Sequence, residues 1–166
     1  MKKYFFLLLI FVFLCVGCGN KTIKDSVKFK QEYEQYNGEY LEIEISDANL
    51  IAYSDVLEVN NLLKDGTGVV YIGSPKDNVS RRAISVLLDV VLNSGLEKVY
   101  YVDTLDGIED LDGIIEKSIP LVLFVVDGEI VKYHVGTIDN KVDLGDDELV
   151  LLYNTYAEGL TLVLSN

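Results

Sequence analysis

The chain has 166 residues, of which 49% are hydrophobic and 10% aromatic, so it is long and apolar enough to bury the core of one domain. This composition excludes a chain that is disordered throughout. The formal net charge is −13, and loss of Lys2 and Lys3 with an N-terminal leader leaves 12 of the 14 basic residues against 27 acidic ones. Such an acidic surface repels nucleic acid and anionic lipid headgroups.

The first residues, "MKKYFFLLLIFVFLCVGCGN", have the layout of a secretion signal: a basic end, an apolar stretch over Tyr4–Val16, and small residues after it. The apolar stretch is too short to span a bilayer comfortably. The segment resembles a bacterial lipoprotein signal, in which the cysteine after a small residue is lipidated, and Gly17-Cys18 fits that pattern. It departs from the pattern three positions before the cysteine, where leucine is usual and Cys15 stands here.

We therefore expect residues 1–17 to be a signal peptide, and Cys18 to carry lipid that attaches an extracytoplasmic protein to the bacterial cell membrane. An uncleaved N-terminal anchor and a plain cleaved signal are the alternatives. Both cysteines of the chain, Cys15 and Cys18, lie in this region. A lipidated mature chain would thus have no free thiol, no disulfide and, with a single histidine, no credible zinc or iron site. We expect no metal and no cofactor.

After Cys18 the sequence "GNKTIKDSVKFKQ" is polar, which predicts a tether over residues 18–37, with a short helix stopped by Gly38 as a weaker feature. The domain proper is expected over 38–166. "YLEIEI" at 40–45 alternates between apolar and acidic residues and predicts a half-buried strand. The apolar spacing of "SDVLEVNNLLKDG" predicts a helix that begins at Ser54 as N-cap and stops near Gly66.

A β-α-β unit is predicted over residues 68–103. "GVVYIG" is a short β-branched run between glycines, typical of a strand covered on both faces. From Val79 the apolar residues follow a helical stripe that Gly95 ends, and "KVYYVD" then returns as a strand parallel to the first.

Three further elements follow. A short helix is expected at the end of "TLDGIEDLDGIIEKS", and Asp127-Gly128 predicts a hairpin between two β-rich runs within 119–136. The last helix is expected from about Asp146. Its predicted buried face consists of Leu149, Leu152, Tyr153, Tyr156, Leu160 and Val163.

This order of elements is that of the thioredoxin fold, an α/β fold with a central mixed β-sheet flanked by helices. "VVYIGSPKDNVSRRAISVLLDVV…GLEKVYYVDT" resembles the active-site strand and helix of thioredoxin-like proteins, especially secreted Gram-positive members of the bacteriocin-transport-accessory type. "SIPLVLFVVDGEIVKYHVGTID" resembles their cis-proline loop and terminal hairpin, with Pro120 in the proline position and Gly136 in the glycine position. The resemblance covers roughly Tyr40 to Gly159.

In the register of this resemblance, the family's Cys-x-x-Cys falls on Asp77, Asn78, Val79 and Ser80. The buried carboxylate that many thioredoxins keep beneath the dithiol would fall near Tyr71. Thiol–disulfide exchange requires a thiolate, which neither an aspartate nor an unactivated serine supplies. The resemblance thus implies the fold, while these departures argue against the family's redox activity.

Asp77 is expected to cap the following helix by accepting from the backbone of Val79 or Ser80, and a ligand-contacting role is the alternative. Catalysis by Ser80 would require an adjacent base, and the only histidine, His134, is most simply a residue of the terminal hairpin. Arg81 and Arg82 are expected to be solvated helix residues. The acidic stretches at 103–113 and 139–148 do not match the spacing of a calcium loop.

The resemblance implies a cis bond between Ile119 and Pro120, with Ser118 and Ile119 against the helix corner. An extended peptide is therefore expected to bind in a groove between Asp77 and Pro120. The sequence favours a redox-inactive, membrane-tethered binding or accessory protein for an envelope or secreted client, without nucleic acid as partner. A non-thiol enzyme of this fold and a purely structural lipoprotein are the alternatives.

Overall fold

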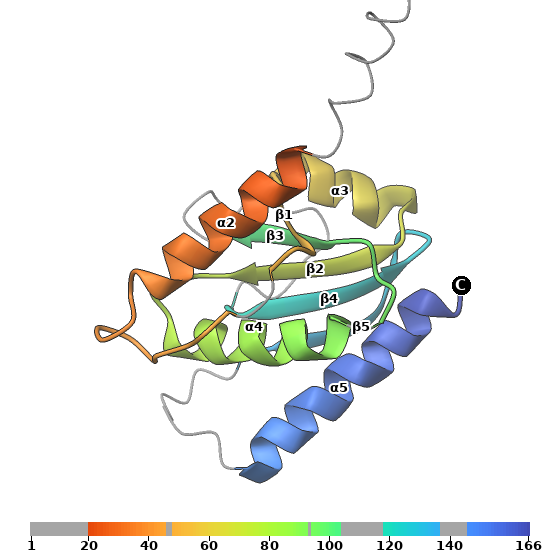
Figure 1. The fold of residues 1–166 in the computed structure, drawn as a ribbon. Coiled ribbons are helices and arrows are strands. Elements are labelled where there is room, and N and C mark those ends of the chain that lie inside the picture. Colours follow the sequence, from red (N-terminus) through yellow and green to blue (C-terminus); the bar gives the residue numbers. More distant parts are fainter. Residues whose placement is uncertain (1–19, 46–47, 93, 104–117, 137–145) are drawn as a thin grey trace, which may run out of the picture.

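A computed structural model describes residues 20–45, 48–92, 94–103, 118–136 and 146–166. Within these residues the chain forms four helices and a five-stranded mixed sheet, an α/β architecture (Figure 1). The helices are α2 (Asn20–Glu34), α3 (Val56–Asp65), α4 (Asn78–Val91) and α5 (Asp146–Leu164). The strands are β1 (Ile51–Tyr53), β2 (Gly68–Gly73), β3 (Val99–Asp103), β4 (Leu121–Val126) and β5 (Glu129–Val135).

The strands lie in the order β1-β3-β2-β4-β5. β1 and β2 both pair with β3 in parallel, so the predicted β-α-β unit of β2, α4 and β3 is confirmed. β4 pairs antiparallel with β2 and with β5. The carboxyl end of β2 therefore lies in the interior of the sheet and leads directly into the corner where α4 begins.

Helices cover both faces of the sheet. On one face, α2, α4 and α5 pack over a core that includes Phe29, Tyr71, Leu87 and Tyr156. On the other face, α3 packs Val59 and Leu62 against a second cluster from β2, β3 and β4. Every residue of β2 is buried, as the continuous apolar run predicted, because a strand covered on both faces has no solvent side.

The predicted hairpin is also confirmed. Asp127 and Gly128 have φ angles of +49° and +81°, the left-handed pair that a two-residue turn requires. Gly128 has a second reason to be glycine, because an added Cβ would lie 2.6 Å from the backbone carbonyl of Lys64. Its N–H donates to the Gly66 carbonyl at 2.8 Å, which fastens the hairpin to the end of α3.

The prediction of a polar tether before residue 38 is wrong for the part that the structure describes. α2 occupies 20–34, and it buries Phe29 and Tyr33 completely in the core. These aromatic residues stack at 4.4 Å between ring centroids, and the ring of Tyr101 packs edge-on against Phe29 at 4.9 Å. The packed part of the chain therefore begins well before the expected boundary.

The strand predicted over 40–45 is not formed. Ile43 and Ile45 are buried and Glu42 and Glu44 are exposed, so the alternation is real, but the backbone pairs with no strand of the sheet. Side chains bind it instead: Asn37 accepts from the Ile43 N–H at 3.1 Å and donates to the Ile43 carbonyl at 2.9 Å.

Helix ends differ from the predictions by a few residues. Asp55 rather than Ser54 caps α3, with its carboxylate accepting from the Glu58 N–H at 2.8 Å. α4 ends at Val91, and Gly95 takes its positive φ of +84° in the turn that follows.

The C-terminal helix α5 begins at Asp146 as predicted and buries Leu152, Tyr156, Leu160 and Val163, although Tyr153 is exposed. Gly159 within it permits close packing, since an added Cβ would lie 2.5 Å from the ring of Phe124. The signal peptide, the lipidation site, the helix expected before Ser118 and most of both acidic stretches lie outside the described residues.

Candidate functional site

The corner between β2 and α4 is built around a helix cap. Asp77 has an extended backbone and accepts from the Ser80 N–H at 2.6 Å, so the predicted N-cap is confirmed. The hydroxyl of Ser80 donates to the same carboxylate oxygen, also at 2.6 Å. The negative charge of Asp77 thus lies at the positive end of the α4 dipole, where free backbone N–H groups stabilise it.

Ser80 is poorly placed for nucleophilic attack. The residue is completely buried, and its hydroxyl is engaged by Asp77 as a donor. A serine nucleophile needs an accessible oxygen and a base that takes its proton. Here the neighbouring carboxylate is already used to cap the helix, and a substrate cannot reach the oxygen without opening the corner.

Tyr71 lies beneath the corner, in the position where the resemblance implied a carboxylate in redox-active relatives. Its hydroxyl donates to the Ser80 carbonyl at 2.8 Å and lies 3.4 Å from the hydroxyl of Tyr33. Burial raises the pKa of Tyr71 well above its ordinary value of 10.0. The group under the corner is therefore a neutral phenol that holds the first turn of α4, and it does not exchange protons near neutral pH.

Arg81 corrects the sequence prediction most clearly. It was expected to be solvated, but it is fully buried and directs its guanidinium into the space between α2 and α4. Nη1 donates to the carbonyls of Tyr33 at 2.6 Å and Pro75 at 3.0 Å, and Nε donates to the carbonyl of Leu41 at 2.5 Å. Nη2 donates to the side-chain oxygen of Asn37.

These acceptors explain why a charged residue is buried there. The Tyr33 carbonyl belongs to the last turn of α2, which carries the negative end of a helix dipole and lacks intrahelical donors. Burial lowers the pKa of Arg81 below its ordinary value. The neighbouring Arg82 is half-buried, and its Nε is enclosed without a hydrogen-bond partner among the described residues.

Asn78 and Arg81 both bind the backbone of Leu41. The side-chain oxygen of Asn78 accepts from the Leu41 N–H at 2.6 Å, while Arg81 binds the Leu41 carbonyl. Both backbone groups of Leu41 are thus held by side chains from the start of α4. The segment that sequence analysis expected to pair in the sheet is instead fixed to the corner.

Pro120 stands at the start of β4 and, as predicted, follows a cis peptide bond. It is buried, while Ser118 and Ile119 are half-buried. Gly136 packs directly on its ring, because an added Cβ would lie 2.2 Å from Pro120 Cδ, and the Gly136 N–H donates to the Pro120 carbonyl at 2.7 Å. The Ile119 side chain packs against the cluster under α3, on the other face of the sheet.

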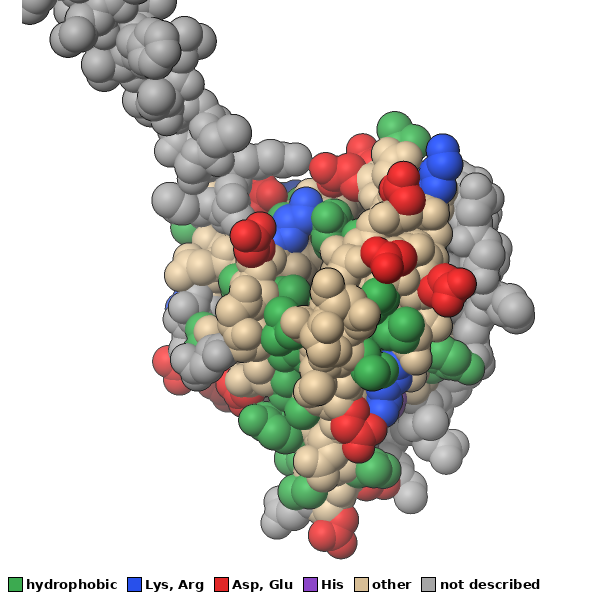
Figure 2. Space-filling view, turned by 90° about the vertical axis from the view of Figure 1, so that its right-hand side faces the viewer, with side chains coloured by type: hydrophobic (Ala, Val, Ile, Leu, Met, Phe, Trp, Pro, Cys, Tyr) green, Lys and Arg blue, Asp and Glu red, His purple; other side chains and the backbone are tan. Residues whose placement is uncertain are grey.

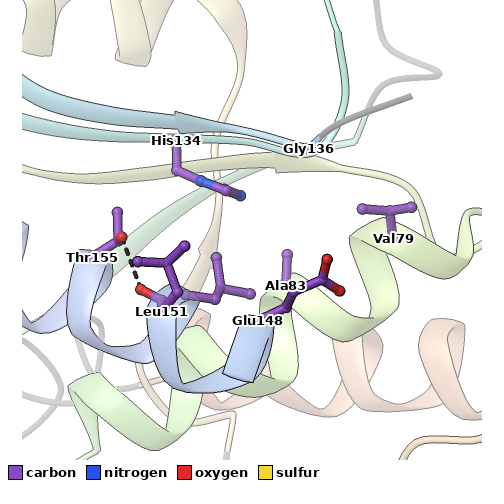
Figure 3. Close-up of a pocket in the computed structure, with 8 residues that line it drawn as sticks. Val79, Ala83, His134, Gly136, Glu148, Leu151 and Thr155 are labelled. Atoms are coloured by element: carbon purple, nitrogen blue, oxygen red, sulfur yellow. Dashed lines mark hydrogen bonds between the residues drawn. The ribbon is translucent and has the colours of Figure 1, made fainter. Parts of the chain in front are cut away.

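A pocket of about 290 Å³ opens beside this proline contact, between α4, α5 and the end of β5 (Figure 3). Its walls are mainly apolar and come from elements far apart in the sequence. The lining residues are Val79, Ala83, His134, Gly136, Glu148, Leu151, Leu152 and Thr155. Gly136 lines the pocket and also packs on Pro120. Val79 lines the pocket and belongs to the segment 77–80. The pocket therefore adjoins both sides of the groove that was expected between Asp77 and Pro120.

His134 is the titratable ring of this pocket. It lies in β5, as predicted, and Figure 3 shows its side chain reaching from the strand toward α4 and α5. Its ring meets that of the buried Tyr156 edge-on at 5.6 Å, and burial lowers its pKa below the ordinary 6.5. Thr155 also lines the pocket, but its hydroxyl donates to the Leu151 carbonyl at 2.9 Å. The pocket therefore offers apolar walls, a neutral imidazole and the carboxylate of Glu148.

Among the described residues, no group of acidic, histidine or cysteine side chains is arranged to hold a metal ion. The same part of the chain contains no helix that is both long and apolar enough to cross a membrane. Comparison of the sequence with protein-family models and with curated proteins gives no match.

Sequence reasoning identified Asp77 and Pro120 but not the pocket. The pocket combines Val79 with residues of β5 and α5 more than fifty positions away, so no local pattern reveals it. One signal was present: Val150 and Leu151 are apolar residues outside the buried stripe of α5, and both are exposed in the structure.

Proposed function

We propose that this chain is a thioredoxin-like domain without thiol chemistry, which binds an extended peptide segment of an envelope or secreted protein while Cys18 attaches it to the outer side of the cell membrane. The proposal has three parts: the fold family, the loss of redox activity and the binding site. Each has separate support.

The sheet order and the chain path support the fold family. Two parallel β-α-β steps are followed by an antiparallel hairpin and a C-terminal helix, and α4 starts at the interior strand β2. The buried cis-proline against Gly136 lies where the sequence resemblance implied it.

The chemistry of the corner supports redox inactivity. The two positions that would carry sulfur hold Asp77 and Ser80, which hydrogen-bond to each other. The cysteines of the whole sequence are Cys15 and Cys18, both N-terminal to α2. Burial of Ser80 also favours binding over catalysis by this hydroxyl.

The pocket carries the binding proposal. It is apolar, large enough for one bulky side chain, and it lies against Gly136, which in turn touches Pro120. Peptides that bind along a strand edge gain affinity from their backbone and specificity from such side-chain pockets. The client segment should thus present an aromatic or aliphatic residue to the space between Val79 and Leu151.

Site-specific photocrosslinking in native membranes tests this proposal. A photoreactive phenylalanine analogue at Leu151 should give a discrete adduct, because this residue lines the pocket and is 67% exposed. Leu57, on α3, is also 67% exposed and provides the matched control. Mass spectrometry of the adduct identifies the crosslinked segment of the client.

A specific client requires two further results. The adduct at Leu151 should disappear when Val79→Phe fills the mouth of the pocket, and the crosslinked segment should contain an apolar anchor residue. Equal labelling from Leu57 and Leu151, or an adduct that survives Val79→Phe, would contradict binding at this pocket. The lipid on Cys18 is tested independently, by the mass of the mature N-terminal peptide.

A further inference from the structure

The helix α2 begins almost immediately after the proposed lipid attachment site. One residue, Gly19, separates Cys18 from Asn20, where α2 starts. A domain on a flexible tether would need a longer polar linker. The distance from lipid to packed domain is therefore set by the helix itself.

α2 is fastened to the domain along its length. Near its start, the Asp25 carboxylate accepts from the Tyr53 N–H at 3.2 Å; further on, the Tyr53 hydroxyl donates to Glu32. At its end, Arg81 donates to the Tyr33 carbonyl. The helix and the sheet thus move as one body, and an orientation imposed on α2 is imposed on the domain.

The charge of α2 reverses that of the rest of the chain. Residues 20–34 contain four lysines, one aspartate and two glutamates, a net charge of +1, whereas residues 35–166 contain eight basic and 24 acidic residues. All four lysines of α2 lie in residues 20–30, a basic segment that holds one acid. Figure 2 shows acidic side chains spread over one face of the domain, with fewer basic ones among them. The single acid of the basic segment, Asp25, is turned toward Tyr53, so it is drawn away from the outer face.

The outer face of this basic segment is free of the core. Ser26, Phe29 and Tyr33 form the buried side of α2, and Lys24 falls on the opposite side at helical spacing. Val27, also away from the buried side, is 51% exposed. Lys28 lies at the edge of this face: its ammonium is 3.9 Å from the centroid of the Tyr53 ring and pairs with Glu32 at 3.5 Å, and Lys30 pairs with Glu34 at 3.4 Å. Exposed ion pairs of this kind contribute little and yield to a stronger anionic surface.

We propose that the outer face of the N-terminal half of α2 lies on the anionic lipid surface to which Cys18 is attached. This inference rests on the proposed lipidation at Cys18. One acyl anchor plus a basic patch is a common two-signal arrangement for stable membrane contact, and the positive end of the helix dipole adds to the attraction. The acidic remainder of the domain is repelled by the same surface.

This contact orients the binding site. Figure 1 places the start of α5 at the opposite end of the molecule from the start of α2, and the first turns of α5 line the pocket. With α2 on the lipid, the pocket faces away from the membrane, toward clients in the extracytoplasmic space.

The experiment uses the lipidated protein reconstituted in vesicles, with Val27→Cys carrying an environment-sensitive fluorophore. Removal of the leader and lipidation of Cys18 make the new thiol unique, and the mass of the protein confirms the lipid. We expect a blue shift and quenching by lipid-borne quenchers in vesicles of phosphatidylglycerol with phosphatidylcholine, and neither in phosphatidylcholine alone. The same fluorophore on Tyr153→Cys in α5 should show the emission of a water-exposed label with both kinds of vesicle, because Tyr153 is 47% exposed.

Charge variants provide the second readout. Lys24→Gln and Lys28→Gln should each lower the ratio of docked to undocked label about fivefold, and added salt should do the same. Lys64→Gln and Lys98→Gln each remove the same single charge elsewhere and should leave the ratio unchanged. A lipidated protein whose residue 27 label stays in water on both vesicles would overturn this inference alone. Absence of lipid on Cys18 would overturn both the proposed anchor and the inference.

Discussion

The guanidinium of Arg81 donates a 2.6 Å hydrogen bond to the backbone carbonyl of Tyr33, which joins the first turn of α4 to the last turn of α2. The carbonyls at the end of a helix have no partner within it, so an external cation is a favourable cap. Through this bond, the corner at the start of α4 is also the point where the end of α2 is attached to the domain.

Arg81→Met should strongly destabilise the protein. The methionine has nearly the same reach but leaves the carbonyls of Leu41 and Pro75 without their donor, and it leaves the Tyr33 carbonyl with only the Tyr36 N–H at 3.4 Å. Unsatisfied buried acceptors cost about 1–3 kcal/mol each, so we expect a loss of roughly 3 kcal/mol or more in the free energy of unfolding. Urea denaturation of the detergent-solubilised protein, followed by circular dichroism, measures it.

Arg82→Met is the matched control one position along the same helix. The Nε of Arg82 is enclosed by the protein and has no hydrogen-bond partner among the described residues. Replacing Arg82 therefore breaks no hydrogen bond of that atom. Its effect should stay within about 1 kcal/mol. Similar losses for both variants would show that Arg81 contributes only as a large side chain.

Asp77→Ala should weaken α4 at its start. The variant loses the acceptor for both the N–H and the hydroxyl of Ser80, and loss of a cap of this kind costs about 0.5–2 kcal/mol. Asp77→Asn keeps an acceptor at the same place and should lose less. The same urea titration compares the two variants. Equal stability of wild type and Asp77→Ala would mean that the cap contributes nothing to the folded state.

The wild-type protein should not accelerate the reduction of a protein disulfide by dithiothreitol. Neither Asp77 nor the buried Ser80 can form the mixed disulfide through which exchange proceeds. Turbidity from reduced insulin measures the rate, and the Asp77→Cys/Ser80→Cys double variant tests whether the assay detects activity on this scaffold. Acceleration by the wild-type protein would refute the loss of redox function.

Gly159→Ala should destabilise α5 although alanine favours helices. The gain from helix propensity is about 1 kcal/mol, but the new methyl group would lie 2.5 Å from the buried ring of Phe124. Overpacking of a tight core costs about 1–3 kcal/mol, so the net change in thermal stability should be negative. Thr155→Ala, one turn earlier in α5, should leave stability nearly unchanged. A more stable Gly159→Ala protein would show that the helix moves freely on the sheet.

The elements that local patterns predicted correctly share a simple cause. The strand at 68–73 is apolar throughout because both faces of the sheet are covered, and the Asp127-Gly128 turn needs two left-handed residues. Asp77 has the side chain and position of an N-cap, and the structure uses it as one. In each case the residues that carry the pattern lie within a few positions of one another in the sequence.

Arg81 and the segment 40–45 were predicted wrongly because their partners are distant. The alternation in 40–45 correctly identified Ile43 and Ile45 as buried, but alternation does not say whether the backbone pairs with a strand or with side chains. Charge alone suggested that Arg81 is solvated, whereas its acceptors lie 40 and 48 positions earlier in the sequence. The pocket escaped prediction for the same reason, since it exists only where three elements meet.

Folding stability should fall as the pH drops below 6.5, because burial holds the pKa of His134 beneath that ordinary value. Above 6.5 the imidazole is neutral in both the folded and the unfolded chain and has no effect. Below it, the unfolded chain takes up the proton first, which favours unfolding until the folded-state pKa is also passed. Glu148 and Tyr156 are the ionisable neighbours given by the pocket and the ring contact, and Tyr156 stays neutral because burial raises its pKa. Urea midpoints of wild type and His134→Gln between pH 7.5 and about 5.5 measure the effect, and identical slopes for the two proteins would rule out His134 as its source.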